Sequence, residues 1–211
     1  MKDVLPHKIG EAHLQEKLGE GGRSVVYGGE WRGQQVALKL YKPKAIKSHS
    51  MHHPQNIAEF EFHRNKAFYD VPGLSIYVAR PLHYWVDPDV CALVQERLAG
   101  SLYYFYFRDH KGKVSPGFKQ HLQTIINLAH DAGLFDVDLH SFNVFVDESS
   151  GEPMPKLFDF NLIPFHERPG FSMSKSLLKL GLTEKASRDN RLLKNFDKIG
   201  RRQKKLLKYF N

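Results

Sequence analysis

Two carboxylates and one amide in the second half of the chain give the clearest indication of chemistry. Asp138 and Asn143 stand five residues apart on a polar stretch, and Asp159 follows two short apolar runs. The first carboxylate can lie beside an acceptor hydroxyl, while the amide and the second carboxylate can hold a divalent metal on a nucleoside triphosphate. This spacing predicts phosphoryl transfer, with Asp138 as the catalytic carboxylate and Asn143 and Asp159 as metal ligands.

A glycine cluster near the N-terminus lies between two strand-like segments. Glycine lets the backbone approach phosphate groups and direct its N–H groups at them. Alone, such a cluster more often marks a hairpin turn, and a lysine on the following strand would be an ordinary solvated lysine. Their order along the chain favours phosphate binding instead. The candidate residues are Gly19, Gly21, Gly22, Ser24, Val26, Ala37 and Lys39.

Taken together, these motifs resemble those of the protein-kinase-like superfamily. The family's H-R-D-x-x-x-x-N loop corresponds to residues 136–143, and its D-F-G corresponds to Asp159-Phe160-Asn161. Its G-x-G-x-x-G-x-V loop is matched at residues 19–26, where Ser24 replaces the third glycine, and its V-A-I-K reads V-A-L-K at residues 36–39. The resemblance covers about residues 14–165.

The resemblance implies an α+β, two-lobed, protein-kinase-like fold. The N-lobe, residues 1–98, would hold a five-stranded antiparallel sheet and one helix, and residues 99–211 would form a truncated, mostly helical C-lobe. The apolar spacing of residues 57–69 predicts the N-lobe helix, and residues 76–85 and 91–98 have the composition of strands.

The other predicted elements lie around the candidate motifs. Residues 42–56 are basic and rich in histidine, and we expect a mobile, solvated loop rather than a metal site, because no cysteine or acidic residue stands at ligand spacing. Residues 117–132 predict an amphipathic helix that ends at Gly133, and Leu134-Phe135 a short strand. The aromatic run at residues 103–107 favours core packing or a platform for an acceptor sugar over base stacking.

The resemblance also implies further site residues. A helix glutamate would pair with Lys39, and of Glu59 and Glu61 the distance to the Pro72-Gly73 stop favours Glu61. Backbone groups of Glu96 and Leu98 would face the adenine ring. The implied cofactors are therefore ATP and Mg²⁺.

Several positions depart from the protein-kinase pattern. Asp136 and Val137 replace the family's His and Arg, so a phosphorylated activation segment would find no arginine clamp there. His140 gives the D-x-H-x-x-N arrangement of small-molecule kinases and could stabilise charge on the transferred group. Asn161 replaces the last glycine of D-F-G and tolerates a left-handed backbone.

Only fifty residues follow Asn161, with no A-P-E motif and little room for a peptide-binding subdomain. Residues 173–182 and 188–210 predict helices, the second one amphipathic and strongly basic. Its basic face is either simply solvated or attracted to an anionic membrane, and we expect its apolar stripe to pack on the C-lobe. These features resemble small bacterial kinases of lipopolysaccharide core sugars and, equally, YrbL-type proteins.

Composition limits the partners without choosing one. The 211 residues carry a formal net charge of +8, which favours anionic partners, and they include one cysteine and no apolar run long enough to span a bilayer. We expect a cytoplasmic enzyme, peripheral on the inner face of the inner membrane, that takes a sugar or glycolipid acceptor and no specific nucleic acid. An atypical protein kinase and a nucleotide-binding pseudokinase are the alternatives, and the oligomeric state stays open.

Overall fold

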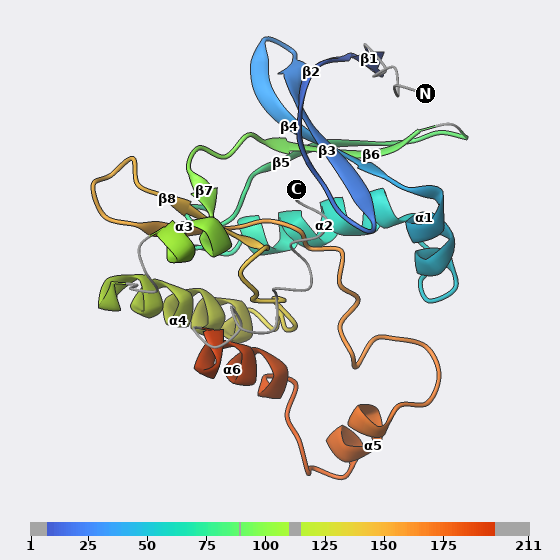
Figure 1. Cartoon of the computed structure of the whole chain (residues 1–211). Coiled ribbons are helices and arrows are strands. Elements are labelled where there is room, and N and C mark those ends of the chain that lie inside the picture. Colours follow the sequence, from blue (N-terminus) through green and yellow to red (C-terminus); the bar gives the residue numbers. More distant parts are fainter. Residues whose placement is uncertain (1–7, 89, 110–114, 197–211) are drawn as a thin grey trace.

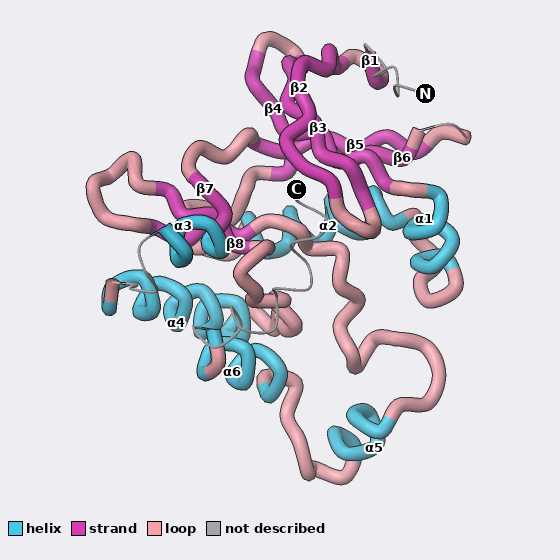
Figure 2. Tube along the Cα trace, in the orientation of Figure 1, coloured by secondary structure: helices cyan, strands magenta, loops and turns pink. Residues whose placement is uncertain are grey.

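The computed structural model describes residues 8–88, 90–109 and 115–196. A twisted sheet with two helices forms the N-terminal part, and helices with a small second sheet form the C-terminal part (Figure 1). Figure 2 shows that strands dominate the first part and helices and loops the second. None of the described helices has the length and apolar character that a membrane span requires.

The N-lobe sheet is antiparallel and has six strands in the order β1-β2-β3-β4-β6-β5. Five of them match the expected sheet, and the sixth, β1, adds two residues at one edge. Arg32 and Gly33 join β3 to β4 with φ values of 50° and 76°, as a tight two-residue hairpin requires. The strands are β1 (Lys8–Ile9), β2 (Ala12–Glu20), β3 (Ser24–Trp31), β4 (Gln34–Tyr41), β5 (Pro81–Val86) and β6 (Cys91–Glu96).

Two helices accompany this sheet, although one was expected. The loop prediction for residues 42–56 is wrong over α1 (Pro43–Ser50), which begins with proline after an extended Lys42. Its side chains Ala45 and His49 are buried, and Ala45 joins a core cluster with strand and α2 residues. Lysine, serine and histidine fill five of the eight positions of α1, so its apolar stripe is too narrow to recognise from sequence.

Helix α2 (Ile57–Tyr69) has the predicted bounds because its start is well marked. The Asn56 side chain accepts a hydrogen bond from the Ala58 N–H at 2.9 Å and caps the first turn. The strand prediction for residues 76–85 is wrong before Pro81. Residues 72–77 form turns there, since Leu74, Tyr77 and Val78 are buried against the C-lobe, and this packing overrides their β-propensity.

The C-lobe is built on α4 (Pro116–Asp131), close to the predicted 117–132. Gly133, at φ 76°, ends this helix, and the Leu134 N–H returns to the Ala129 carbonyl at 2.8 Å. The predicted strand at Leu134-Phe135 is therefore wrong: its first N–H closes the helix end instead of pairing with a strand. The other C-lobe elements are β7 (Ser101–Leu102), α3 (Tyr103–Asp109), β8 (Val144–Asp147), β9 (Met154–Leu157), α5 (Met173–Lys179) and α6 (Ser187–Lys194).

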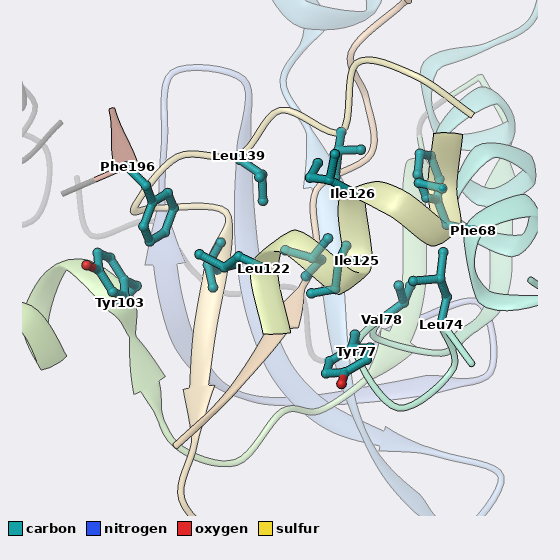
Figure 3. Packing of buried hydrophobic residues seen from close by; sticks show 14 of the residues in the cluster. Phe68, Leu74, Tyr77, Val78, Tyr103, Leu122, Ile125, Ile126, Leu139 and Phe196 are labelled. Carbon is teal, nitrogen blue, oxygen red and sulfur yellow. The ribbon is translucent and has the colours of Figure 1, made fainter. Parts of the chain in front are cut away.

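One hydrophobic cluster fills the C-lobe and reaches toward the N-lobe (Figure 3). The apolar face of α4 supplies its centre, with Leu122, Ile125 and Ile126 fully buried. Tyr103, from the aromatic run, is 2% exposed and stacks on α4, so core packing is its role. This packed base holds the loop between α4 and β8, where Asp138 lies.

The chain end agrees only in part with the predicted helix at residues 188–210. Helix α6 ends at Lys194, and Phe196 is buried, with its ring 4.5 Å from that of Tyr103 (Figure 3). The expected packing on the C-lobe is therefore seen for this part of the apolar stripe. Residues 197–211, which carry most of the predicted basic face, lie outside the described residues.

Candidate active site

A buried lysine joins the two lobes at the centre of the candidate site. Lys39, on β4, places its Nζ 2.9 Å from both carboxylate oxygens of Glu61 and 2.8 Å from Asp159 Oδ1. Burial alone would lower the pKa of Lys39, but the carboxylates of Asp159 and Glu61 outweigh it and raise this pKa. The ammonium therefore stays charged and holds α2 against the segment after β9.

Glu61, rather than Glu59, faces Lys39. The Glu61 side chain is fully buried, and its carboxylate also accepts hydrogen bonds from the Tyr41 hydroxyl and, at 3.2 Å, from the Phe160 N–H. Glu59 lies two residues earlier on α2 and approaches His63 at 4.0 Å instead. The predicted pairing is thus present, and its role in binding nucleotide remains a prediction.

The predicted catalytic loop brings three of its candidates together. Asn143 Nδ2 lies 3.3 Å from Asp138 Oδ2, and His140 Nε2 lies 3.9 Å from the same oxygen. Asp138 has a φ of 58° and Asp159 a φ of 67°. Non-glycine residues adopt this left-handed conformation at a cost, so the surrounding contacts must hold both carboxylates in place.

Helix α6 supplies two residues of the site that sequence analysis missed. Asp189 is fully buried and accepts the N–H groups of Asp136 at 2.8 Å and Val137 at 2.9 Å. Arg188 donates to Asp138 Oδ1 at 2.6 Å and lies 3.4 Å from Asp136 Oδ1. These contacts join residues about fifty positions apart, and the only local signal was an adjacent pair of opposite charges.

Asp136, at the position of the family's histidine, connects the loop to later segments. Its buried carboxylate accepts the Phe165 N–H at 2.7 Å. Arg64, from α2, donates to the Asp136 carbonyl at 3.1 Å and also to that of Phe135. Together with α6, these bonds fix the backbone on the N-terminal side of Asp138.

The glycine-rich turn between β2 and β3 lies near the Asp159 segment. Arg23, in that turn, donates to Asn161 Oδ1 at 3.0 Å, and Val26 is paired with Lys39 across the strands. A Cβ added at Gly19, Gly21 or Gly22 would meet no atom within 4 Å. Open space therefore surrounds these glycines. Ser24 is buried on β3, and Ala37 is buried on β4 opposite Gln95.

The predicted hinge residues lie at and beyond the end of β6. The Glu96 N–H donates to the Arg80 carbonyl at 2.8 Å, and a Glu96 carboxylate oxygen accepts the Arg80 N–H at 3.0 Å. Any contact of the Glu96 backbone with an adenine ring would therefore use its carbonyl group. Leu98 follows the strand, half-buried on the connection to β7.

The predicted metal ligands stand at neighbouring strand ends. Val144 pairs with Leu157, and the Phe158 N–H donates to the Asn143 carbonyl at 3.3 Å, so the segments carrying Asn143 and Asp159 run side by side. Among the described residues, no group of three or more His, Cys, Asp and Glu side chains could hold a metal. Mg²⁺ bound with a nucleotide needs only one or two protein ligands, because phosphates and water complete its shell.

The charge state of these ligands fits such a metal. Burial alone would raise the pKa of Asp159, but the Lys39 ammonium outweighs it, and the net shift is downward. Asp159 is therefore ionised at neutral pH. The Asn143 amide uses its NH₂ group on Asp138, which leaves the amide oxygen as an acceptor for a cation. One carboxylate and one amide oxygen are the donors that Mg²⁺ prefers.

Comparison with known proteins supports the fold. No protein-family model matches the chain, and a search of curated proteins found no match. Among solved structures, the PknI kinase domain of Mycobacterium tuberculosis is similar with a TM-score of 0.59 and 16% identity, covering 90% of this chain and 74% of that one. The apo form of PpkA-294 is similar with a TM-score of 0.56 and 18% identity over 72% of this chain.

This chain spans 59% of the PpkA-294 structure. With the order of strands and helices seen here, the two likenesses show that the chain has a protein-kinase-like α+β fold.

Proposed function

We propose that the protein is an ATP-dependent phosphotransferase that phosphorylates a hydroxyl group of a sugar or of a lipopolysaccharide core glycolipid. One observation carries this proposal. Lys39, paired with Glu61, reaches Asp159 from the opposite lobe, so motifs 120 residues apart meet at one buried point. A nucleotide phosphate site requires this meeting of a lysine and a metal-binding carboxylate.

Each chemical role that phosphoryl transfer requires would fall to a residue of this site. Bound Mg²⁺-ATP would supply the γ-phosphoryl group and the metal that neutralises its charge. Lys39 would bind the α- and β-phosphates, Asn143 and Asp159 would hold the metal, and the backbone at residues 19–24 would cover the phosphates. Asp138 would accept the proton of the acceptor hydroxyl, and His140 would stabilise charge beside it.

The proposed phosphoryl transfer needs no reactant other than ATP and the acceptor. The acceptor oxygen forms a bond to the γ-phosphorus while the bond from that phosphorus to the β–γ bridging oxygen breaks. The hydroxyl proton moves to the Asp138 carboxylate. The products are a phosphorylated acceptor and ADP, and solvent removes the proton from Asp138 afterwards.

The described residues that follow Asn161 include two short helices, α5 and α6. An atypical protein kinase, which would transfer the phosphoryl group to a protein hydroxyl, is the alternative to a sugar or glycolipid kinase.

Two contacts favour a different class of function. Arg188 binds the carboxylate of Asp138 at 2.6 Å, and Arg23 binds Asn161 beside the metal ligand. A nucleotide-binding pseudokinase could hold its catalytic groups permanently in such an ion pair and hydrogen bond. In an active enzyme, the Arg188 contact would have to leave Asp138 able to accept a proton.

The test compares nucleotide binding with turnover in the full chain. Asp138→Asn should bind Mg²⁺-ATP normally while turnover falls about 100-fold or more, the usual scale for loss of a general base. Asp159→Ala should lose the Mg²⁺-dependent part of ATP binding in calorimetry. Full activity in Asp138→Asn would remove the catalytic assignment, and an unchanged Mg²⁺-ATP affinity in Asp159→Ala would remove the metal site.

The acceptor screen separates the candidate functions. Core oligosaccharide, a generic protein substrate and no acceptor should be offered in parallel with labelled ATP. Transfer to the oligosaccharide supports the proposal, whereas transfer to protein alone supports the protein-kinase alternative. ATP binding with no transfer to any acceptor in the screen supports the pseudokinase.

We further propose that the basic sequence beyond Phe196 attracts the enzyme to the anionic inner face of a membrane. Each lysine or arginine near anionic lipid contributes about 1 kcal/mol, and salt screens this attraction. Sedimentation should show binding to anionic vesicles but not to neutral ones. Equal binding to both would remove the membrane role.

A further inference from the structure

A cavity of about 280 Å³ lies beside the catalytic loop, between α5 and α6. Its walls combine apolar, hydroxyl and cationic side chains from three segments of the C-lobe. The size suits one sugar-sized group, since pockets for larger ligands start at about 300 Å³. The residues that the argument uses are Phe165, Ser174, Leu177, Thr183, Arg188 and Arg191.

The charge of the cavity favours an anion. Arg188 and Arg191 stand three residues apart on α6, so their side chains share one face of the helix. The one carboxylate in the lining belongs to Glu184, which is exposed. Within the described residues, the Arg191 guanidinium forms no ion pair, so it is free to bind a ligand.

Hydroxyl groups shape the same wall. Ser187, also in the lining, accepts the Glu184 N–H at 3.0 Å and receives a hydrogen bond from the Thr183 hydroxyl at 3.0 Å. These bonds fix the connection that leads into α6. The N-terminal end of α6, which carries Arg188 and Arg191, is therefore held in place by these hydrogen bonds.

Arg188 links the cavity to the catalytic carboxylate. It lines the cavity and, with the same guanidinium, reaches Asp138 at 2.6 Å and Asp136 at 3.4 Å. A guanidinium has five N–H donors, so these two carboxylates leave donors for a third anion. A group bound in the cavity thus lies one arginine side chain away from the proposed base.

We propose that this cavity binds an anionic group of the acceptor, a phosphate or a carboxylate, and so presents a neighbouring hydroxyl to Asp138. The inference rests on the proposed function and names the acceptor as an anion. Arginine suits this task because its planar fork binds phosphate and carboxylate through paired hydrogen bonds. Leu177 and Phe165 would contact the apolar face of the attached sugar.

The surroundings allow either a free or a lipid-attached acceptor. Four large apolar side chains near α5 are exposed: Phe171 at 87%, Leu180 and Leu182 at 70%, and Met173 at 69%. An acceptor in a membrane would bring lipid to this side of the cavity, whereas a soluble sugar phosphate would use the cavity alone. Both sources share the anionic group, and separate arms of the experiment distinguish them.

The binding arm uses inorganic phosphate and acetate as probes, titrated into the full chain and followed by NMR of the arginine side chains. Arg191→Gln should weaken phosphate binding about tenfold or more, because the variant loses charge-assisted hydrogen bonds to the phosphate. Leu177→Trp, which fills the cavity without changing charge, should do the same. Lys194→Gln is the matched control, because it removes one charge from α6 outside the cavity lining.

The outcome of this arm is decisive. Binding unaffected by Arg191→Gln and Leu177→Trp would overturn the inference. An equal loss in Lys194→Gln would also overturn it, because phosphate would then be sensing only the general basic surface. Retention of probe binding in the control and its loss in the two cavity variants is the expected result.

A second readout separates this inference from the proposed function. ATP hydrolysis without acceptor is measured on the wild-type protein, in parallel with its phosphate binding. In the wild-type protein, normal hydrolysis with no phosphate binding in the cavity would overturn the anionic acceptor and keep the kinase. Phosphate binding in the cavity with no nucleotide turnover under any condition would overturn the acceptor role and the kinase together.

Binding to phosphatidylglycerol vesicles distinguishes a lipid-attached acceptor from a soluble one. A lipid-attached acceptor predicts that changing both Phe171 and Leu180 to serine weakens vesicle binding while phosphate binding stays normal. A soluble acceptor predicts that this variant behaves as the wild type in both assays. With either kind of acceptor, the Arg191→Gln variant should bind phosphate more weakly than the wild-type protein.

Discussion

Asp189 offers the sharpest test of how α6 supports the site. Its fully buried carboxylate accepts two backbone N–H groups, from Asp136 and Val137, and pairs with His130 at 3.1 Å. In Asp189→Asn the side-chain oxygen can still accept one N–H. Its NH₂ group would face the other, so one buried donor would be left unsatisfied.

The expected cost follows from these contacts. Loss of one hydrogen bond to a charged group costs about 1.5–3 kcal/mol, and an unsatisfied buried N–H costs about 1–3 kcal/mol. Since these two terms overlap, we expect Asp189→Asn to lower the free energy of unfolding by about 3 kcal/mol. Asp189→Ala, which leaves both N–H groups unpaired, should cost at least as much.

Urea unfolding followed by circular dichroism measures this change, and Mg²⁺-ATP turnover measured in parallel reports the placement of Asp138. Asn190→Ala is the matched control, since Asn190 is the exposed neighbour on the same helix. A cost below about 1 kcal/mol in Asp189→Asn, or unchanged turnover, would refute the view that α6 holds the catalytic loop.

Three further changes test other parts of the structure. Glu61→Gln should cost about 3 kcal/mol in urea unfolding, because it removes one partner from a buried ion pair; no change would mean that the pair is not buried in solution. Burial, reinforced by nearby His53, lowers the pKa of His49 to about 4, so the unfolded state binds a proton first as the pH falls. Stability should therefore drop between pH 6.5 and about 4, by at most about 3 kcal/mol, and His49→Phe should remove that part of the pH dependence. Gly100 has a φ of 102° and an added Cβ would lie 2.0 Å from a backbone oxygen, so Gly100→Ala should melt well below Gly151→Ala, whose Cβ meets nothing within 4 Å.

Local signals explain the elements that sequence analysis predicted well. Helix α2 is bounded by a capping asparagine and followed by a Pro-Gly turn, and α4 begins at Pro116 and stops before Gly133. Each signal acts within a few residues of the element that it bounds. The resemblance added the protein-kinase-like α+β fold, which the likeness to kinase structures confirms.

The errors have a common cause in contacts that are distant along the chain. Residues 76–80 look like a strand until Tyr77 and Val78 are seen packed against the C-lobe. Arg188 and Asp189 carry no periodic pattern that would identify them, and their partners lie about fifty residues earlier. Polar contacts of this kind depend on the finished tertiary structure, and a single sequence does not contain them in readable form.

Helix α2 is fixed to the C-lobe at Phe68 and to the N-lobe sheet at Glu61, so a tilt of the helix about Phe68 moves Glu61. Its C-terminal end is clamped in the C-lobe cluster through Phe68, while Glu61, seven residues earlier, holds Lys39 of the sheet. At 1.5 Å per residue this arm is about 10 Å long, so a tilt of about 10° about Phe68 would displace Glu61 by about 2 Å. A displacement of that size exceeds the tolerance of a hydrogen bond at 2.9 Å. Small changes in the angle between the lobes would thus be converted into making or breaking the lysine contact.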